Sequence, residues 1–168
     1  ILSNYAFFEN ELDEMDKPEI KEVDIDNPFI PTAYSAIDHR YFAPLIQLSK
    51  EANKENGGEG IDALLLTNSL VDMNYHKGFS DADMVLLLNN DVFKSRGSLK
   101  STQKRIIRLS RFLYYFDPLQ HHGFFIISLL DRRFYPEANY PLLLFDNMFS
   151  FYNSKTKLEF TCRNDDLE

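Results

Sequence analysis

Asp81 and Asp83 have the residue type and the spacing that metal-dependent chemistry requires. Side chains alternate between the two faces of an extended chain, so carboxylates two residues apart point to the same side of a sheet. Mg²⁺ takes one or two carboxylates and fills its other positions with water and phosphate oxygens, and it therefore favours a clustered aspartate pair. This arrangement suits a divalent metal, so we expect Asp81 and Asp83 to be magnesium ligands, with an Asp-x-Asp that serves a turn beside the strand as the alternative.

Two apolar runs must position these aspartates. Residues 63–66 form the first run, which leads to Asn68 and Ser69, and residues 84–88 form the second, which follows the aspartates directly. Both runs have the length of a strand and are bounded by polar residues, which favours two buried central strands. Residues 71–80 between them are predicted to form a loop or a single helical turn.

Two helices are predicted by apolar residues that recur with a period near that of an α-helix. The first spans residues 32–56, as one helix or two short ones, and the glycines of residues 57–60 end it. The second begins with an N-cap at Ser98 and ends at Asp117, before Pro118. Its predicted buried face consists of Ile106, Leu109, Leu113 and Phe116.

The charges of the chain are unevenly distributed. The second helix has a basic face that is typical of a solvated surface, with a phosphate- or nucleic-acid-contacting face as the alternative; it consists of Lys100, Lys104, Arg108 and Arg111. The net charge of −8 arises within the first 60 residues, which carry thirteen acidic and five basic side chains. Since the remainder is neutral overall, net charge does not indicate nucleic-acid binding, although such binding stays possible.

The rest of the chain completes one domain of the α/β (α+β) class, with a mixed central sheet flanked by helices. Residues 123–130 are interpreted as a third buried strand, residues 140–152 as an apolar segment with a helix as one candidate, and residues 155–162 as an edge strand. Residues 32–168 form this domain, and residues 1–31 an acidic N-terminal arm. The arm is expected to contain a short helix over residues 4–15 and to be packed by Ile20, Val23, Ile25 and Phe29.

Composition narrows the class of protein. Hydrophobic residues make up 44% of the chain and aromatic residues 14%, which favours a packed globule. The single cysteine, Cys162, excludes an intramolecular disulfide and a zinc site built on cysteines. No apolar run approaches the length of a membrane span and no signal peptide is recognisable, so we expect a cytoplasmic protein without a membrane partner. A chain that begins at Ile1 is also compatible with a fragment of a longer protein.

The order of these motifs resembles the nucleotidyltransferase superfamily typified by DNA polymerase beta and the minimal bacterial and archaeal nucleotidyltransferases. The family motif is a strand ending in Gly-Ser, a gap, and then Asp-x-Asp followed by apolar residues. Here Asn68-Ser69 stands at the Gly-Ser position and Asp81-Ala82-Asp83 at the carboxylate position. A helix precedes the first strand, another follows the second, and a third strand comes next, so that the resemblance covers residues 41–130.

The resemblance implies transfer of a nucleotidyl group from a nucleoside triphosphate to a hydroxyl of an acceptor that the sequence does not identify. Two Mg²⁺ ions, held by Asp81 and Asp83, would activate the hydroxyl and neutralise the leaving group. Asn68 and Ser69 would bind the nucleotide phosphates, as the serine of the family motif does.

Two positions depart from the family pattern. Asn68 replaces the glycine that lets the backbone approach the triphosphate, although asparagine tolerates positive φ better than most residues. The family's third carboxylate usually begins the next core strand, where this chain has His121-His122-Gly123. His122 is our candidate for that ligand or general base, since Asp117 lies too early and Asp131 lies at the far end of the strand.

Two other functions therefore stay open beside the enzyme. The chain has the features expected of a binding or regulatory module that keeps the nucleotidyltransferase fold without catalysis. It is also compatible with an unrelated α/β protein-interaction domain that uses its acidic arm as the contact surface. Apolar runs that are helical, or that are not adjacent in one sheet, would favour this last alternative.

Overall fold

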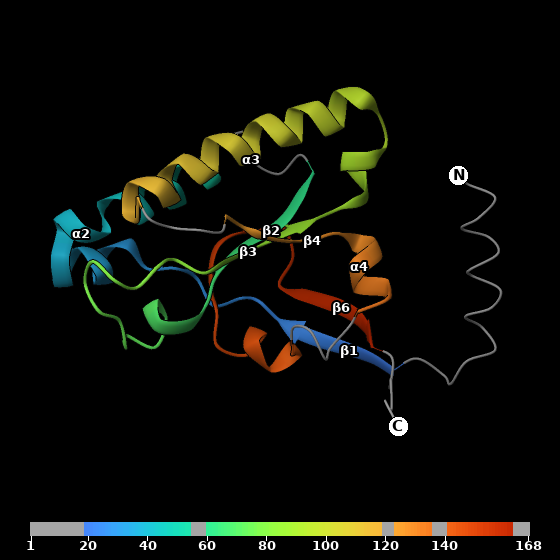
Figure 1. Ribbon diagram of the computed structural model, residues 1–168. Coiled ribbons are helices and arrows are strands. Elements are labelled where there is room, and N and C mark those ends of the chain that lie inside the picture. The colour runs from blue at the N-terminus through green and yellow to red at the C-terminus, as the bar shows by residue number, and fades with distance from the viewer. Residues whose placement is uncertain (1–18, 55–59, 119–122, 136–140, 163–168) are drawn as a thin grey trace.

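A computed structural model describes residues 19–54, 60–118, 123–135 and 141–162 of the chain. It has the predicted α+β class, with a central four-stranded mixed sheet and a separate two-stranded sheet (Figure 1). The strands are β1 (Glu19–Asp24), β2 (Ile61–Leu66), β3 (Met84–Leu88), β4 (Phe125–Ile127), β5 (Phe149–Asn153) and β6 (Lys157–Cys162). The helices are α2 (Pro31–Ala52), α3 (Arg96–Phe116) and α4 (Leu129–Arg133), with short 3₁₀ helices η1 (Asn68–Leu70), η2 (Asn90–Phe93) and η3 (Leu142–Phe145).

The two predicted central strands lie side by side. The order in the larger sheet is β4-β3-β2-β5, and β2 pairs antiparallel with both β3 and β5. Strand β4 pairs parallel with β3, and α3 provides the crossover between them. Every residue of β2 and β3 is buried, which explains why both read as continuous apolar runs rather than as alternating ones.

Both faces of the central sheet are covered. Helices α2 and α3 cover one face, and the β1–β6 pair, α4 and η3 lie on the other (Figure 1). Leu64, Met84 and Leu86 belong to the core beneath α2 and α3, whereas Leu65 and Val85 belong to the core on the opposite face. This division follows from the alternation of side chains along a strand.

Residues 19–31 of the predicted arm are part of the fold. Strand β1 pairs antiparallel with β6, and Val23, Ile25 and Phe29 are buried as expected. The expectation for Ile20 is wrong, because its side chain is 67% exposed on the outer face of this two-stranded sheet. The predicted helix over residues 4–15 lies outside the described residues.

Four predicted boundaries need correction. The N-cap of α3 is Ser95, whose hydroxyl oxygen accepts from the backbone N–H of Ser98 at 3.0 Å, and not Ser98. The third strand is only Phe125–Ile127, and it is an edge strand with Phe125 and Ile126 exposed. An apolar run alone does not distinguish an edge strand from a central one.

The other two corrections follow from local capping and from pairing. Ser128 and Asp131 form a capping box that starts α4 at Leu129, inside the predicted third strand, so that strand ends at Ile127. The segment 140–152 is not helical where it is described, because it supplies η3 and then β5, which pairs with β2. The periodicity of residues 140–152 left their secondary structure ambiguous, and pairing with β2 determines that the last part is a strand.

A buried ion pair joins α4 to the central sheet. The register of β2 shifts between Ile61 and Ala63, and Asp62 lies at that irregularity. Arg132 of α4 donates from Nη2 to Asp62 Oδ2 at 2.7 Å, and both side chains are 3% exposed. Bulges redirect side chains in this way, and here the bulge allows a charged residue inside an otherwise apolar strand.

We predict that Arg132→Met destabilises the fold by about 3–5 kcal/mol, because it leaves the buried Asp62 carboxylate with only the more distant Lys155 ammonium, at 3.9 Å, as its counter-charge. The double variant Asp62→Leu with Arg132→Met should recover most of that loss, since it removes both buried charges. Urea denaturation followed by circular dichroism measures the three free energies of unfolding.

The matched control is Lys157→Met, which removes the exposed ion pair between Lys157 and Glu22. Its free energy of unfolding should change by less than about 1 kcal/mol. An Arg132→Met variant no less stable than this control would show that the buried pair does not hold α4 on the sheet.

Candidate functional site

The Asn-Ser turn begins where β2 ends. Thr67 is extended, and its backbone N–H donates to the carbonyl of Asp83 at 3.0 Å, which continues the β2–β3 pairing by one step. Asn68 then takes a φ of 63° and opens η1. Asparagine is among the non-glycine residues that adopt this left-handed conformation most readily, so the turn forms without the family's glycine.

The Asn68 side chain contacts one of the two predicted metal ligands. Asn68 Nδ2 donates to Asp83 Oδ2 at 2.9 Å, and the Thr67 hydroxyl donates to Asn68 Oδ1 at 3.1 Å. Thr67 is itself buried, so this chain of hydrogen bonds is anchored in the core. The structure therefore joins two predicted site residues that are fifteen positions apart.

The two aspartates share one face of the chain. Ala82 between them is fully buried in the core beneath α2 and α3. Asp81 and Asp83 are both half-buried, and alternation directs them to the side opposite Ala82. Two adjacent carboxylates on one face, neither fully buried, are oxygen ligands of the kind that Mg²⁺ takes.

Ser69 lies in the first turn after β2, next to the Asn68–Asp83 contact. It is half-buried, and its carbonyl accepts from the backbone N–H of Asn74 at 2.9 Å. The following residue, Leu70, is fully buried, and its carbonyl accepts from the hydroxyl of Tyr34 on α2 at 2.7 Å. Helix α2 thus fixes the backbone that carries Ser69.

The structure does not supply a third ligand from the residues proposed for it. His122 lies outside the described residues. Asp117 is the C-cap of α3, and Asp131 is engaged in the capping box of α4 beyond the opposite end of β4. Within the described ranges, no group of three histidine, cysteine, aspartate or glutamate side chains has the geometry to hold a metal ion.

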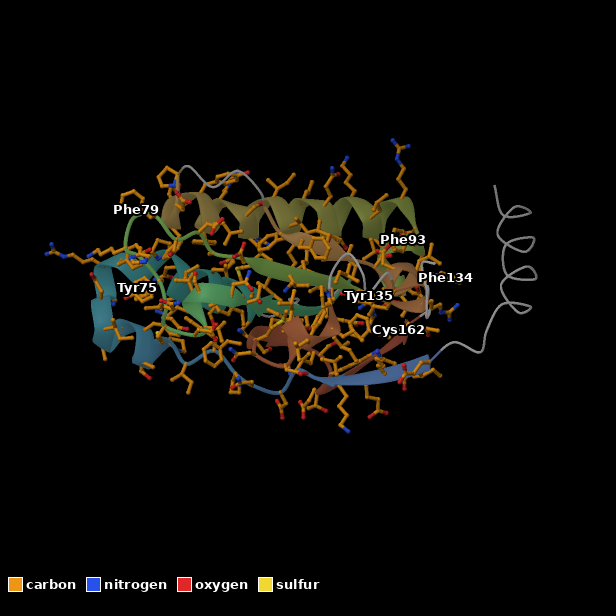
Figure 2. All side chains as sticks on the ribbon, turned by 60° about the horizontal axis from the view of Figure 1, so that its bottom comes forward. Tyr75, Phe79, Phe93, Phe134, Tyr135 and Cys162 are labelled. Atoms are coloured by element: carbon orange, nitrogen blue, oxygen red, sulfur yellow. The ribbon has the colours of Figure 1, made fainter. Side chains whose placement is uncertain are left out.

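The loop between Ser69 and Asp81 is tied to α2 by contacts that the sequence did not predict. Lys77 forms an ion pair with Asp38, and its ammonium lies 5.5 Å from the centre of the Tyr41 ring. The Tyr41 ring stacks in turn on Tyr75, with ring centres 5.8 Å apart. Phe79 of the same loop is 91% exposed, at the end of the molecule where Tyr75 lies (Figure 2).

A break in α2 creates these contacts. Asp38 has non-helical dihedral angles of −155° and 93°, and its carboxylate accepts from the backbone N–H of Tyr41 at 3.0 Å. Asp38 therefore caps the second half of the helix while it binds Lys77. The hydrogen bond from Lys77 lowers the pKa of Asp38, and burial raises the pKa of the Tyr41 hydroxyl. Aspartate is a preferred N-cap residue, and Asp38 inside the predicted helix is the signal of a break that the sequence analysis missed.

No protein-family model matches the chain, and no curated protein or solved structure matches it. Among the described helices, none is long and apolar enough to cross a membrane. The functional argument therefore rests on the residues themselves.

Tyr34 gives a test of how the turn is held. Burial raises the pKa of Tyr34 to about 12, from an ordinary value of 10.0. We predict that Tyr34→Phe costs about 1–2 kcal/mol at pH 7, because the buried Leu70 carbonyl loses its donor. The unfolded tyrosine ionises near pH 10 but the folded one resists ionisation, so the wild type should lose about 2–3 kcal/mol as the pH rises from 10 to 12.

The stability difference between wild type and Tyr34→Phe should therefore fall to about zero or reverse in sign over that range of pH, as measured by urea denaturation. Tyr115→Phe is the control, since Tyr115 is 73% exposed on α3. If the difference in free energy of unfolding between wild type and Tyr34→Phe stays constant between pH 10 and 12, burial does not raise the pKa of the Tyr34 hydroxyl.

Proposed function

We propose that the chain is a magnesium-dependent nucleotidyltransferase, which moves a nucleotidyl group from a nucleoside triphosphate to a hydroxyl of an acceptor. One observation carries the proposal: the turn that bears Asn68 and Ser69 lies against the Asp-x-Asp segment before β3, held there by the Thr67–Asp83 backbone hydrogen bond and the Asn68–Asp83 side-chain hydrogen bond. The order of elements supports it further. Helix α2 precedes β2, the Asp-x-Asp segment leads into β3, and α3 then connects to β4.

The proposed reaction uses the side chains of Asp81, Asp83, Ser69 and His122. The acceptor oxygen attacks the α-phosphorus, the bond from that phosphorus to the bridging oxygen breaks, and pyrophosphate leaves with the electron pair. Two Mg²⁺ ions would supply charge neutralisation at the attacking and leaving oxygens. Asp81 and Asp83 would hold these ions, and Ser69 would donate to phosphate oxygens. His122 is the residue that the sequence offers as base for the proton of the acceptor hydroxyl.

A second candidate is a binding or regulatory module with the same fold and no catalysis. The same Asn68–Asp83 hydrogen bond favours it, because the amide occupies one carboxylate oxygen that a metal would otherwise use. The described residues also hold no group of three metal-ligand side chains. The protein-interaction alternative has less support, since the two apolar runs are adjacent strands and β1 of the acidic arm is paired within the fold.

Asp81→Asn combined with Asp83→Asn should remove magnesium-dependent binding of nucleoside triphosphates, because amides replace the anionic ligands at nearly constant volume. We expect the affinity to fall by about tenfold or more, the loss typical of a charge-assisted contact. Isothermal titration calorimetry with each of the four common ribonucleoside triphosphates, with and without Mg²⁺, measures it.

Asp24→Asn with Asp26→Asn is the matched control, because these exposed aspartates have the same spacing and the same charge change outside the proposed site. Its binding should equal that of the wild type. Wild-type protein that gives no magnesium-dependent heat with any of the four nucleotides at millimolar concentration would rule out the proposal.

Asn68→Gly separates the enzyme from the non-catalytic module. Glycine adopts the φ of 63° without strain and releases the Asp83 carboxylate. If Asn68 obstructs a metal site, nucleotide binding in Mg²⁺ should become tighter by about threefold to tenfold, with stability changed by less than about 1 kcal/mol.

Asn68→Ala provides the comparison, because it also removes the amide but keeps a Cβ in the left-handed conformation without the polar side chain that lets asparagine adopt it. It should cost about 1–2 kcal/mol in the free energy of unfolding. Weaker nucleotide binding in Asn68→Gly would instead mean that the amide itself contacts the nucleotide.

A further inference from the structure

A pocket lies between α4, β6 and β1, away from the Asp-x-Asp segment. Its volume is about 360 Å³, which is within the range of pockets that take small molecules. Leu129 and Leu158 give it an apolar part, and most of its other lining side chains are charged. Both the size and the lining are suited to a small polar ligand.

The lining is basic, although the protein as a whole is acidic. Four of the nine lining residues are Arg132, Arg133, Lys155 and Lys157, against two glutamates, Glu22 and Glu159. Lys157 pairs with Glu22 at 3.3 Å, and both are more than half exposed. Arg133 makes no ion pair with any residue that the structure describes. The lining therefore carries four cations against two acids, and Asp62 beside it is the counter-charge of Arg132 and lies 3.9 Å from Lys155.

Arg132 forms the floor of this site and is only partly satisfied. Its Nη2 is bound to Asp62, and the side chain is 3% exposed. Its Nε is buried and has no hydrogen-bond partner among the described residues. A guanidinium presents five donors in a fixed fork that matches phosphate and carboxylate oxygens. Because its Nε has no accessible surface, Arg132 contributes charge beneath the pocket and not a direct contact through that atom.

This pocket and the Asn68–Asp83 contact lie near opposite ends of β2. Asp62 contacts the floor of the pocket and Asn68 follows the other end of the strand, about 20 Å away at the rise of an extended chain. In Figure 2, Tyr75 and Phe79 of the loop before Asp81 lie at one end of the molecule, and Phe134, next to Arg133, lies at the other. One small molecule cannot occupy both sites.

We propose that this pocket binds a small molecule through an oxyanion group, a phosphate or a carboxylate, at a site separate from the proposed nucleotide site. Arg133 and Lys157 neutralise its charge from α4 and β6, and Leu129 and Leu158 contact the rest of the ligand.

The proposal is tested by titrating the full chain with inorganic phosphate, and separately with citrate, in the absence of divalent metal. Binding is followed by nuclear magnetic resonance. Saturable shifts are expected in the backbone amides of residues 129–133 and 157–161. Arg133→Ser with Lys157→Ser should weaken binding by about tenfold, because two cations leave the site while the buried Asp62–Arg132 pair stays intact. Tighter binding of phosphate than of citrate identifies a phosphorylated ligand, and the reverse identifies a polycarboxylate.

Lys100→Ser with Lys104→Ser on the exposed face of α3 is the control for charge alone, and its affinity should stay within about twofold of the wild type. Asp81→Asn with Asp83→Asn should also leave these shifts unchanged, so failure of the nucleotide site would not affect the result. Shifts that do not saturate, that occur outside α4 and β6, or that weaken equally in the α3 control would overturn the proposal.

Discussion

The antiparallel pairing of β2 with β3 is the constraint on which the rest of the structure depends. It brings the end of β2 beside the start of β3, and the Thr67–Asp83 backbone hydrogen bond continues it into the candidate site. A slip by one residue would exchange the side chains of the two cores that pack on opposite faces of these strands. The pairing of β2 with β3 therefore brings Asn68 and Asp83 together.

The central sheet and the Asp-x-Asp face could be predicted from the sequence because they depend on local patterns. The runs at residues 63–66 and 84–88 are apolar throughout, and their polar boundaries define where each strand ends. Alternation then places Asp81 and Asp83 on one face without knowledge of the fold. The second helix followed from its period: Leu109, Leu113 and Phe116 are buried as predicted, whereas Ile106 is half-buried and the N-cap is Ser95, not Ser98.

Contacts between distant segments could not be predicted in this way. The Asp38–Lys77 ion pair joins residues 39 positions apart, and the Asp62–Arg132 pair joins residues 70 apart. The first pair depends on a break in α2 at Asp38, and the second depends on a bulge in β2 at Asp62. Neither position is a glycine or a proline, so the sequence does not mark the irregularity. The Asp38–Lys77 pair holds the loop before Asp81, and the Asp62–Arg132 pair holds the floor of the basic pocket.

The most direct test is to map the residues at which a divalent ion binds. Mn²⁺, added with a non-hydrolysable nucleoside triphosphate, broadens the nuclear magnetic resonance signals of nearby backbone amides. The account predicts that broadening begins at Asn68, Ser69 and residues 81–83. Broadening that begins instead at the exposed acidic residues of β1, with residues 81–83 unaffected, would contradict it.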